Sequence, residues 1–187
     1  MDKVSYVMAK KSIEITAVCP GEEGSVEIER KFLVDAADIP DDLSQYPQYA
    51  ILQGYIVADG STAVRLRLKG SSCYITVKSG HGISRSEHEA EISRAAFDAL
   101  WPATEGRRLE KIRYEIPGSA GLMFELDLYH GKLQGLSTVE AEFDSMHSAE
   151  QFTPPDWFGR DVTQDSRYGN YSLAVNGLAT SESTPDP

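Results

Sequence analysis

The chain has 187 residues, of which 41% are hydrophobic and 25% are charged, a composition typical of a globular protein with one well-buried domain. Its net charge of −11 and its pI near 4.8 exclude general binding to nucleic acids or anionic membranes, unless the few basic residues are gathered in one place. No stretch is apolar for long enough to span a bilayer, and the N-terminal residues lack the apolar core of a signal peptide. We therefore expect a cytoplasmic protein.

Three parts of the chain differ in composition. Residues 1–25 are an N-terminal extension, in which alternating apolar residues could add an edge strand before the break at Pro20-Gly21. Residues 26–176 carry the regular pattern of a folded domain, and residues 177–187 are small, polar and Pro-containing, as in a disordered tail. Cys73 shares a strand face with Ile75 and Val77, so we expect it to fill the core.

Within the domain the sequence predicts one strand after another, joined by turns so short that neighbouring strands must mostly be antiparallel. The expected strands cover residues 26–34, 50–58, 62–69, 73–79, 85–92, 107–116, 122–130 and 137–143. Short helices are expected over 93–101, 148–152 and 168–175, with a helical turn over 36–39.

The first of these strands has an unusual charged face. Glu27, Glu29 and Lys31 alternate with Ile28 and Phe32, so two carboxylates and an ammonium group point the same way. A divalent cation between the carboxylates and an anion beside the lysine would satisfy all three charges. For this strand alone, a solvated sheet face is the favoured interpretation, because most half-buried strands alternate with their charges outward.

Nearly every other strand repeats this division into an apolar and a formally charged face. The charged faces contain Arg65, Arg67, Lys69, Lys78, Arg85, Glu87, Glu89, Glu91, Lys111, Arg113, Glu115, Glu125, Asp127, Glu140 and Glu142. A solvated sheet face usually mixes Ser, Thr and Gln with its charges, whereas here some strands carry only acids and others mainly bases. This pattern favours a mainly β protein whose sheet closes into a barrel with the charged face inside.

Buried charges on this scale must be paired, hydrated or bound to ligands. A polyphosphate held by the bases, with divalent cations between its oxygens and the carboxylates, would fill such a lumen. Carboxylate-only ligands favour Mg²⁺ or Mn²⁺ over zinc. We expect the short helices, with Trp101, and a loop that contains Trp157 to cover the apolar outside of the barrel. The alternative is that a second subunit covers it, in which case the protein is a homodimer.

The residues also resemble a known family. The segment from Glu27 to Lys31 matches the ExExK signature of the CYTH superfamily, the triphosphate tunnel metalloenzymes, which includes bacterial inorganic triphosphatases. Further segments follow the family in order and spacing across roughly residues 25–175: Gln53-Gly54-Tyr55, VRLR at 64–67, TVK at 76–78, EHEAEI at 87–92, KIRY at 111–114, ELD at 125–127, VEAEF at 139–143 and DVTQDSRYGNYSLA at 161–174.

The resemblance implies a closed, eight-stranded antiparallel tunnel that binds triphosphate groups. It implies metal ligands at Glu27, Glu29, Asp127, Glu140 and Glu142, with Glu125 as a further member of the acidic set. It implies phosphate-binding roles for Lys31, Arg65, Arg67, Lys78, Lys111 and Arg113, and for Arg167 near the tunnel mouth. Lys111, Glu29 and Glu142 are then the catalytic candidates, and the segment from Tyr168 resembles a C-terminal helix that can plug the tunnel. The first 25 residues depart from the short bacterial members, in which the signature lies near the N-terminus.

Members of the family catalyse different reactions. We expect metal-dependent hydrolysis of the terminal phosphate of inorganic tripolyphosphate, with nucleoside triphosphates as poorer substrates, because the charged faces show no clear aromatic or amide pocket for a base. Tyr74 and Tyr129 keep an organic substrate open. The alternatives are a class IV-type adenylyl cyclase, a thiamine triphosphatase, or a module that binds polyphosphate without turnover. We expect neither nucleic acid nor membrane as a partner.

Overall fold

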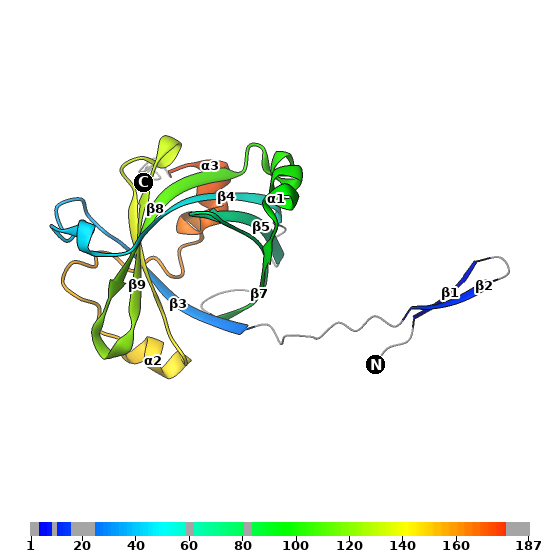
Figure 1. Ribbon diagram of the computed structural model, residues 1–187. Helices are drawn as coiled ribbons and strands as arrows, with labels where there is room; N and C mark the ends of the chain where they lie inside the picture. The colour runs from blue at the N-terminus through cyan, green and yellow to red at the C-terminus, as the bar shows by residue number, and fades with distance from the viewer. Residues whose placement is uncertain (1–3, 9–10, 16–24, 59–61, 81–83, 179–187) are drawn as a thin grey trace, which may run out of the picture.

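The computed structural model describes residues 4–8, 11–15, 25–58, 62–80 and 84–178. Eight antiparallel strands form one curled sheet, with short helices on its outside and across one end (Figure 1). The strands are β3 (Ser25–Leu33), β4 (Gln48–Ala58), β5 (Thr62–Lys69), β6 (Ser72–Ser79), β7 (Ser84–Ile92), β8 (Arg108–Pro117), β9 (Met123–Tyr129) and β10 (Ser137–Glu142). The helices are α1 (Arg94–Leu100), α2 (Met146–Gln151) and α3 (Asn170–Asn176), with 3₁₀ turns η1 (Leu43–Gln45), η2 (Trp101–Thr104), η3 (Ser119–Gly121), η4 (Gly131–Leu133) and η5 (Ser166–Tyr168). The predicted mainly β fold with antiparallel strands is confirmed.

Hydrogen-bonded neighbours follow the order β10-β3-β7-β6-β5-β4-β8-β9, and β10 also pairs with β9, so the pairing returns to its first strand. The shortest pairing joins β3 to β7, where only Ser25–Ile28 of β3 takes part. The far half of β3 has a different neighbour, because the Gly159 amide donates to the Leu33 carbonyl at 2.8 Å and the Val162 amide donates to the Lys31 carbonyl at 2.8 Å. The segment around residues 159–163 thus continues the wall where β7 no longer accompanies β3.

The strands described in the N-terminal extension before residue 16 lie outside this sheet. These strands, β1 (Val4–Met8) and β2 (Lys11–Ile15), pair antiparallel with each other in a separate two-stranded sheet. The prediction of an added edge strand is therefore wrong, and the physical reason is that pairing across a two-residue connection costs little loop-closure entropy. The predicted tail beyond Leu178 lies outside the described residues. No helix in the described part of the chain has the length and apolarity that crossing a membrane requires.

The apolar outer face of the sheet is covered as the sequence predicts. Helix α1, capped by the Ser93 side chain, buries Phe97 against Leu66 and Cys73, and Trp101 stacks on Phe97 at 4.9 Å between ring centroids. On the opposite side, α2 and the loop that follows it cover β3, β9 and β10. The aromatic residues packed there are Phe32, Phe124, Phe143, Phe152, Trp157 and Phe158. Because successive strand residues alternate, this covering leaves the charged residues to face inward.

Candidate active site

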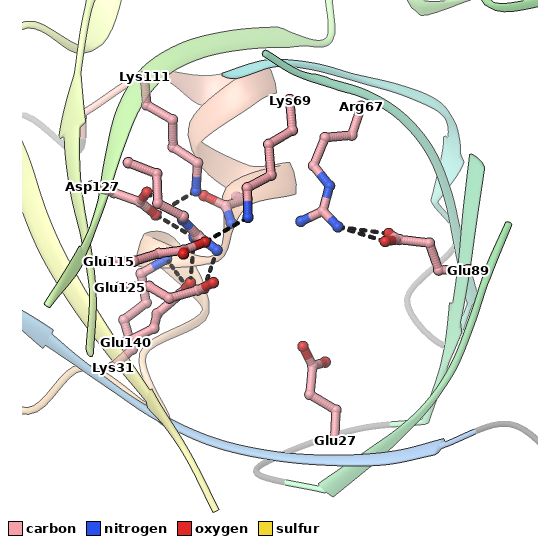
Figure 2. Close-up of polar contacts among 12 residues, drawn as sticks. Glu27, Lys31, Arg67, Lys69, Glu89, Lys111, Glu115, Glu125, Asp127 and Glu140 are labelled. Carbon is pink, nitrogen blue, oxygen red and sulfur yellow. Dashed lines mark hydrogen bonds and ion pairs between the residues drawn. The ribbon is translucent and has the colours of Figure 1, made fainter. Parts of the chain in front are cut away.

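The inner face of the sheet surrounds a cavity of about 1580 Å³. Figure 2 shows charged side chains projecting into it from opposite walls, with Lys31 and Lys111 on one side and Arg67 on the other. The predicted residues that line it are Glu27, Glu29, Lys31, Arg65, Arg67, Lys78, Lys111, Arg113, Glu140 and Glu142. Asp127 lies directly behind this lining and is completely buried, in contact with Lys111 and Arg113.

The most deeply buried charges form one network around Arg113. Its Nε and Nη2 donate to both oxygens of Asp127 at 2.7 and 2.6 Å, and its Nη2 also donates to Glu140 at 2.8 Å. Lys111 Nζ donates to Asp127 as well, and Lys31 Nζ lies 3.0 Å from Glu140. Although burial opposes it, attraction from Arg113 and Lys111 lowers the pKa of Asp127, and attraction from Lys31 and Arg113 lowers that of Glu140. Both acids are therefore ionised and hold the bases in place.

The two buried lysines differ in their hold on a proton. Burial, followed by repulsion from Arg113, lowers the pKa of Lys111 to about 8. For Lys31 burial also acts against the charge, but the Glu140 carboxylate outweighs it and raises the pKa. Near neutral pH, Lys111 is thus the lysine in this network that most readily gives up a proton.

The opposite wall is a second network, built from β5, β6 and β7. Arg67 Nη2 donates to both oxygens of Glu89 at 2.7 and 2.8 Å, and Thr76 Oγ1 donates to Glu89 at 2.6 Å. Arg65 Nε donates in turn to Thr76 Oγ1 at 3.2 Å, and its Nη2 reaches Glu87 at 3.3 Å. Glu87 and Glu89 belong to a charged strand face for which the strand pattern predicts no specific role. In the structure they are the counter-ions of Arg65 and Arg67, the predicted phosphate-binding arginines.

Glu27 shares a lysine with one of these counter-ions. Lys78 Nζ lies 2.5 Å from Glu27 and 2.7 Å from Glu87, and all three side chains are mostly buried. Burial, followed by repulsion from Glu29, raises the pKa of Glu27 to about 7, whereas attraction to Lys78 and Arg65, acting against burial, lowers the pKa of Glu87. Lys78 therefore contacts two different carboxylates: Glu87, which stays ionised, and Glu27, which takes up a proton near pH 7.

One mouth of the cavity is acidic. Glu142, the last residue of β10, pairs in register with Glu29 of β3, and Glu125 of β9 lies nearby. Burial, followed by repulsion from Glu125 and Glu29, raises the pKa of Glu142. Among the described residues no group of His, Cys, Asp and Glu is close enough to hold a metal as the side chains stand. The excess of carboxylate charge, and a donor set made only of oxygen, nevertheless fit a hard divalent cation at this mouth.

The opposite end of the cavity is neutral and aromatic. Gln53 and Tyr55 face inward from β4, Gln53 Nε2 donates to Tyr55 Oη at 2.8 Å, and Tyr129 donates to Asn170 of α3 at 2.7 Å. The sequence predicted no clear aromatic or amide pocket. The signal for one was the position of Gln53 and Tyr55 on the same face of strand 50–58, but neither side chain is charged, so they do not belong to the charged pattern on which the site prediction rested.

Arg167 is the predicted substrate-binding residue that the structure does not bring into this cavity. Its side chain is 61% exposed and pairs with Asp165, with 2.7 Å between Nη2 and Oδ2. It lines a separate surface depression together with Arg30 and Asp161. Its predicted contact with substrate stays a prediction.

The fold and the inward-facing ExExK strand define a β-barrel-like protein built to hold a polyanion. No family model matches the sequence. The chain is 47% identical over 152 residues to an inorganic triphosphatase of Nitrosomonas europaea, covering 80% of this chain and 97% of that protein. It is 38% identical over 152 residues to an inorganic triphosphatase of Acetivibrio thermocellus, covering 80% of this chain and 94% of that protein. The crystal structure of the inorganic triphosphatase NE1496 matches with a TM-score of 0.61 and 43% identity, over 82% of this chain and 97% of that chain. The chain belongs to the family of bacterial inorganic triphosphatases in the CYTH superfamily.

Proposed function

We propose that this protein hydrolyses the terminal phosphate of inorganic tripolyphosphate with Mg²⁺ or Mn²⁺, and that nucleoside triphosphates are poorer substrates. One observation carries the proposal: in a chain with a net charge of −11, basic side chains from β3, β5, β6 and β8 converge on a single cavity. Such a concentration of Lys and Arg in a buried site fits a compact polyanion. The relatives named inorganic triphosphatase support the same substrate.

In this proposal the curled sheet works as a closed tunnel around the anion. Arg65 and Arg67 bind it from one wall, and Lys31 and Arg113 bind it from the other. Each base now contacts a carboxylate, so phosphate oxygens replace Glu89, Glu87 or Glu140 as the acceptors when substrate enters. This exchange keeps the buried cations paired at every stage, which avoids the cost of isolated buried charge.

Glu29 and Glu142 at the acidic mouth are the best placed residues to hold the metal, with Glu27 beside them. A divalent cation bound there supplies charge neutralisation on the phosphate oxygens and a more acidic water. Asp127 and Glu140 belong to the proposed metal set, and in the described structure they hold Lys31, Lys111 and Arg113 in position. Lys111 either neutralises the developing charge as an ammonium group or, with its pKa near 8, takes a proton at Nζ.

The test is release of phosphate from tripolyphosphate, ATP and thiamine triphosphate by the purified chain, with Mg²⁺ or Mn²⁺ and with chelator. We expect the fastest release from tripolyphosphate and none with chelator. Arg67→Ala should lower kcat/KM at least tenfold, because it removes a charge-assisted contact. The matched control is Arg94→Ala, whose exposed guanidinium pairs with Asp98 on the outside of the sheet, and it should change kcat/KM less than twofold. Production of cyclic AMP would favour a cyclase, a preference for thiamine triphosphate would favour that alternative, and binding without turnover would identify a polyphosphate-binding module.

A further inference from the structure

Helix α3 spans the neutral end of the cavity. Its residues Leu173 and Ala174 are buried against Tyr55, Leu109 and Tyr129, which project from β4, β8 and β9. Its other face, including Asn170 and Tyr171, lines the cavity. In Figure 1 the helix lies beneath β8 and β4, on the inner side of the sheet. The cavity is therefore blocked at this end by a short element that contains no charged residue.

The contacts that seat α3 are few and specific. Tyr129 Oη donates to Asn170 Oδ1 at 2.7 Å, and Tyr129 is only 3% exposed. The rings of Tyr55 and Tyr171 meet edge to face with 5.2 Å between centroids. At the other end of the helix, Lys132 of η4 donates to the carbonyl oxygen of Ala174. The Tyr129–Asn170 bond fixes the first turn of α3 to the strand wall.

This seat lies directly beside the phosphate-binding charges. Tyr129 is opposite Lys111 in the register of β8 and β9, and Lys111 Nζ lies 5.5 Å from the centroid of its ring. Along the cavity the order is therefore an acidic mouth at Glu29 and Glu142, a basic centre, and a neutral wall formed by α3. An anion centred on the bases, with its reacting phosphate toward the acidic mouth, turns its other end toward α3.

We propose that the Tyr129–Asn170 hydrogen bond is a latch that seats α3 at the closed end of the cavity, and that the seated helix selects an unsubstituted triphosphate against one that carries an organic group. The proposal rests on the proposed function. A nucleoside attached to the inner phosphate needs the volume that Tyr55, Tyr171 and the first turn of α3 occupy. These groups are held in place, because Gln53 donates to Tyr55, the two tyrosine rings are in contact, and Tyr129 donates to Asn170. Inorganic tripolyphosphate ends in a bare phosphate and leaves the helix seated.

The experiment compares Tyr129→Phe and Asn170→Ala with the wild type. Each variant removes one half of the latch while keeping the buried ring or the helix. Val175→Ala is the matched control, because Val175 lies on the same helix and is 42% exposed, away from the cavity lining. The measured quantity is the ratio of kcat/KM for ATP to kcat/KM for tripolyphosphate, together with hydrogen exchange of the α3 amides.

Both latch variants should raise the ATP to tripolyphosphate ratio by about three- to tenfold, the effect of one hydrogen bond, and should speed exchange in α3. Val175→Ala should alter neither. A loosened helix with an unchanged ratio would overturn the proposal, because the organic group would then lie at the acidic mouth. Unchanged exchange in both variants would also overturn it, since the bond would not seat the helix.

Failure of the latch and failure of the proposed function give different results. If the wild type hydrolyses neither compound, the proposed function fails, and the latch is then judged by the thermal stabilisation that tripolyphosphate and ATP each give to the wild type and the variants. If ATP raises the melting temperature of the latch variants but not that of the wild type, the proposal that seated α3 selects the ligand is still supported. An equal rise in all proteins would refute it.

Discussion

Asp127→Asn offers the most informative single change in the buried network. The substitution keeps the shape of the side chain but removes the charge that Lys111 and Arg113 contact. Arg113 retains Glu125 and Glu140, whereas among the ion pairs of the described residues Lys111 has only Asp127. The destabilisation therefore comes mainly from Lys111, whose buried ammonium group loses its ion-pair partner.

Removing one partner of a buried ion pair typically costs about 3–5 kcal/mol. For a domain of this size we expect the melting temperature to fall by roughly 6–20 °C. Glu115→Gln is the control, because its pair with Lys69 has the same chemistry at 2.7 Å but about a quarter of each side chain is exposed. A partly exposed pair is solvated and screened more than a buried one and contributes on the order of 1 kcal/mol, so the control should shift by no more than about 4 °C.

The pH dependence of this loss has a definite sign. A lysine with a lowered pKa binds fewer protons in the folded than in the unfolded protein, so its cost shrinks as pH rises above the folded value of about 8. Without Asp127 the pKa of Lys111 falls further, and the difference from wild type should be largest below pH 8 and smallest near pH 10. Tripolyphosphate supplies the missing negative charge, so it should stabilise the variant more than the wild type.

Thermal melts of Asp127→Asn, Glu115→Gln and the wild type, from pH 6 to pH 10, with and without tripolyphosphate, measure all of these effects. A shift for Asp127→Asn no larger than that of the control would refute the reasoning. If the melt is unchanged while metal-dependent activity disappears, Asp127 is a metal ligand, as the family resemblance implies, and the buried bases are held by other groups.

Four further substitutions address the remaining charges. Glu29→Gln and Glu142→Gln should each lower activity by at least ~100-fold, as when a metal-coordinating group is lost; near-normal rates at low metal would contradict the metal assignment. Glu27→Gln should be more stable than wild type at pH 8, by up to roughly 3 kcal/mol, and equal to it below pH 4.5. The reason is that the raised pKa of Glu27 gives the wild type stability at low pH, which is lost as pH rises through about 7. Equal melting temperatures at pH 8 would refute that pKa. Arg67→Ala should weaken tripolyphosphate binding without lowering the apo melting temperature, and a destabilised apo protein with intact binding would make Arg67 a structural residue instead.

Strand periodicity alone determined much of this molecule. The alternation on each strand placed Glu27, Glu29 and Lys31 on one face and Ile28 and Phe32 on the other, and the structure has them so. Ser93 at a helix start and Cys73 on an apolar face were equally local signals, and both were confirmed. These features follow from the sequence because a period of two residues fixes the face of every side chain once the strand is recognised.

Only the tertiary structure decided which charges meet. Glu89 lies 22 residues from Arg67 and Asp127 lies 14 from Arg113, and no local pattern specifies such partners. The family resemblance implies that Arg167 binds substrate, whereas in this structure its side chain pairs with Asp165 at the surface, so that role stays a prediction. The sequence associated Tyr129 only with an organic substrate and did not place Tyr55 beside it, whereas both pack with α3 at the closed end of the cavity. Pairing across a sheet depends on strand register and on the pairing of β10 with both β3 and β9, which are set by the packing of the whole sheet and not by any single segment.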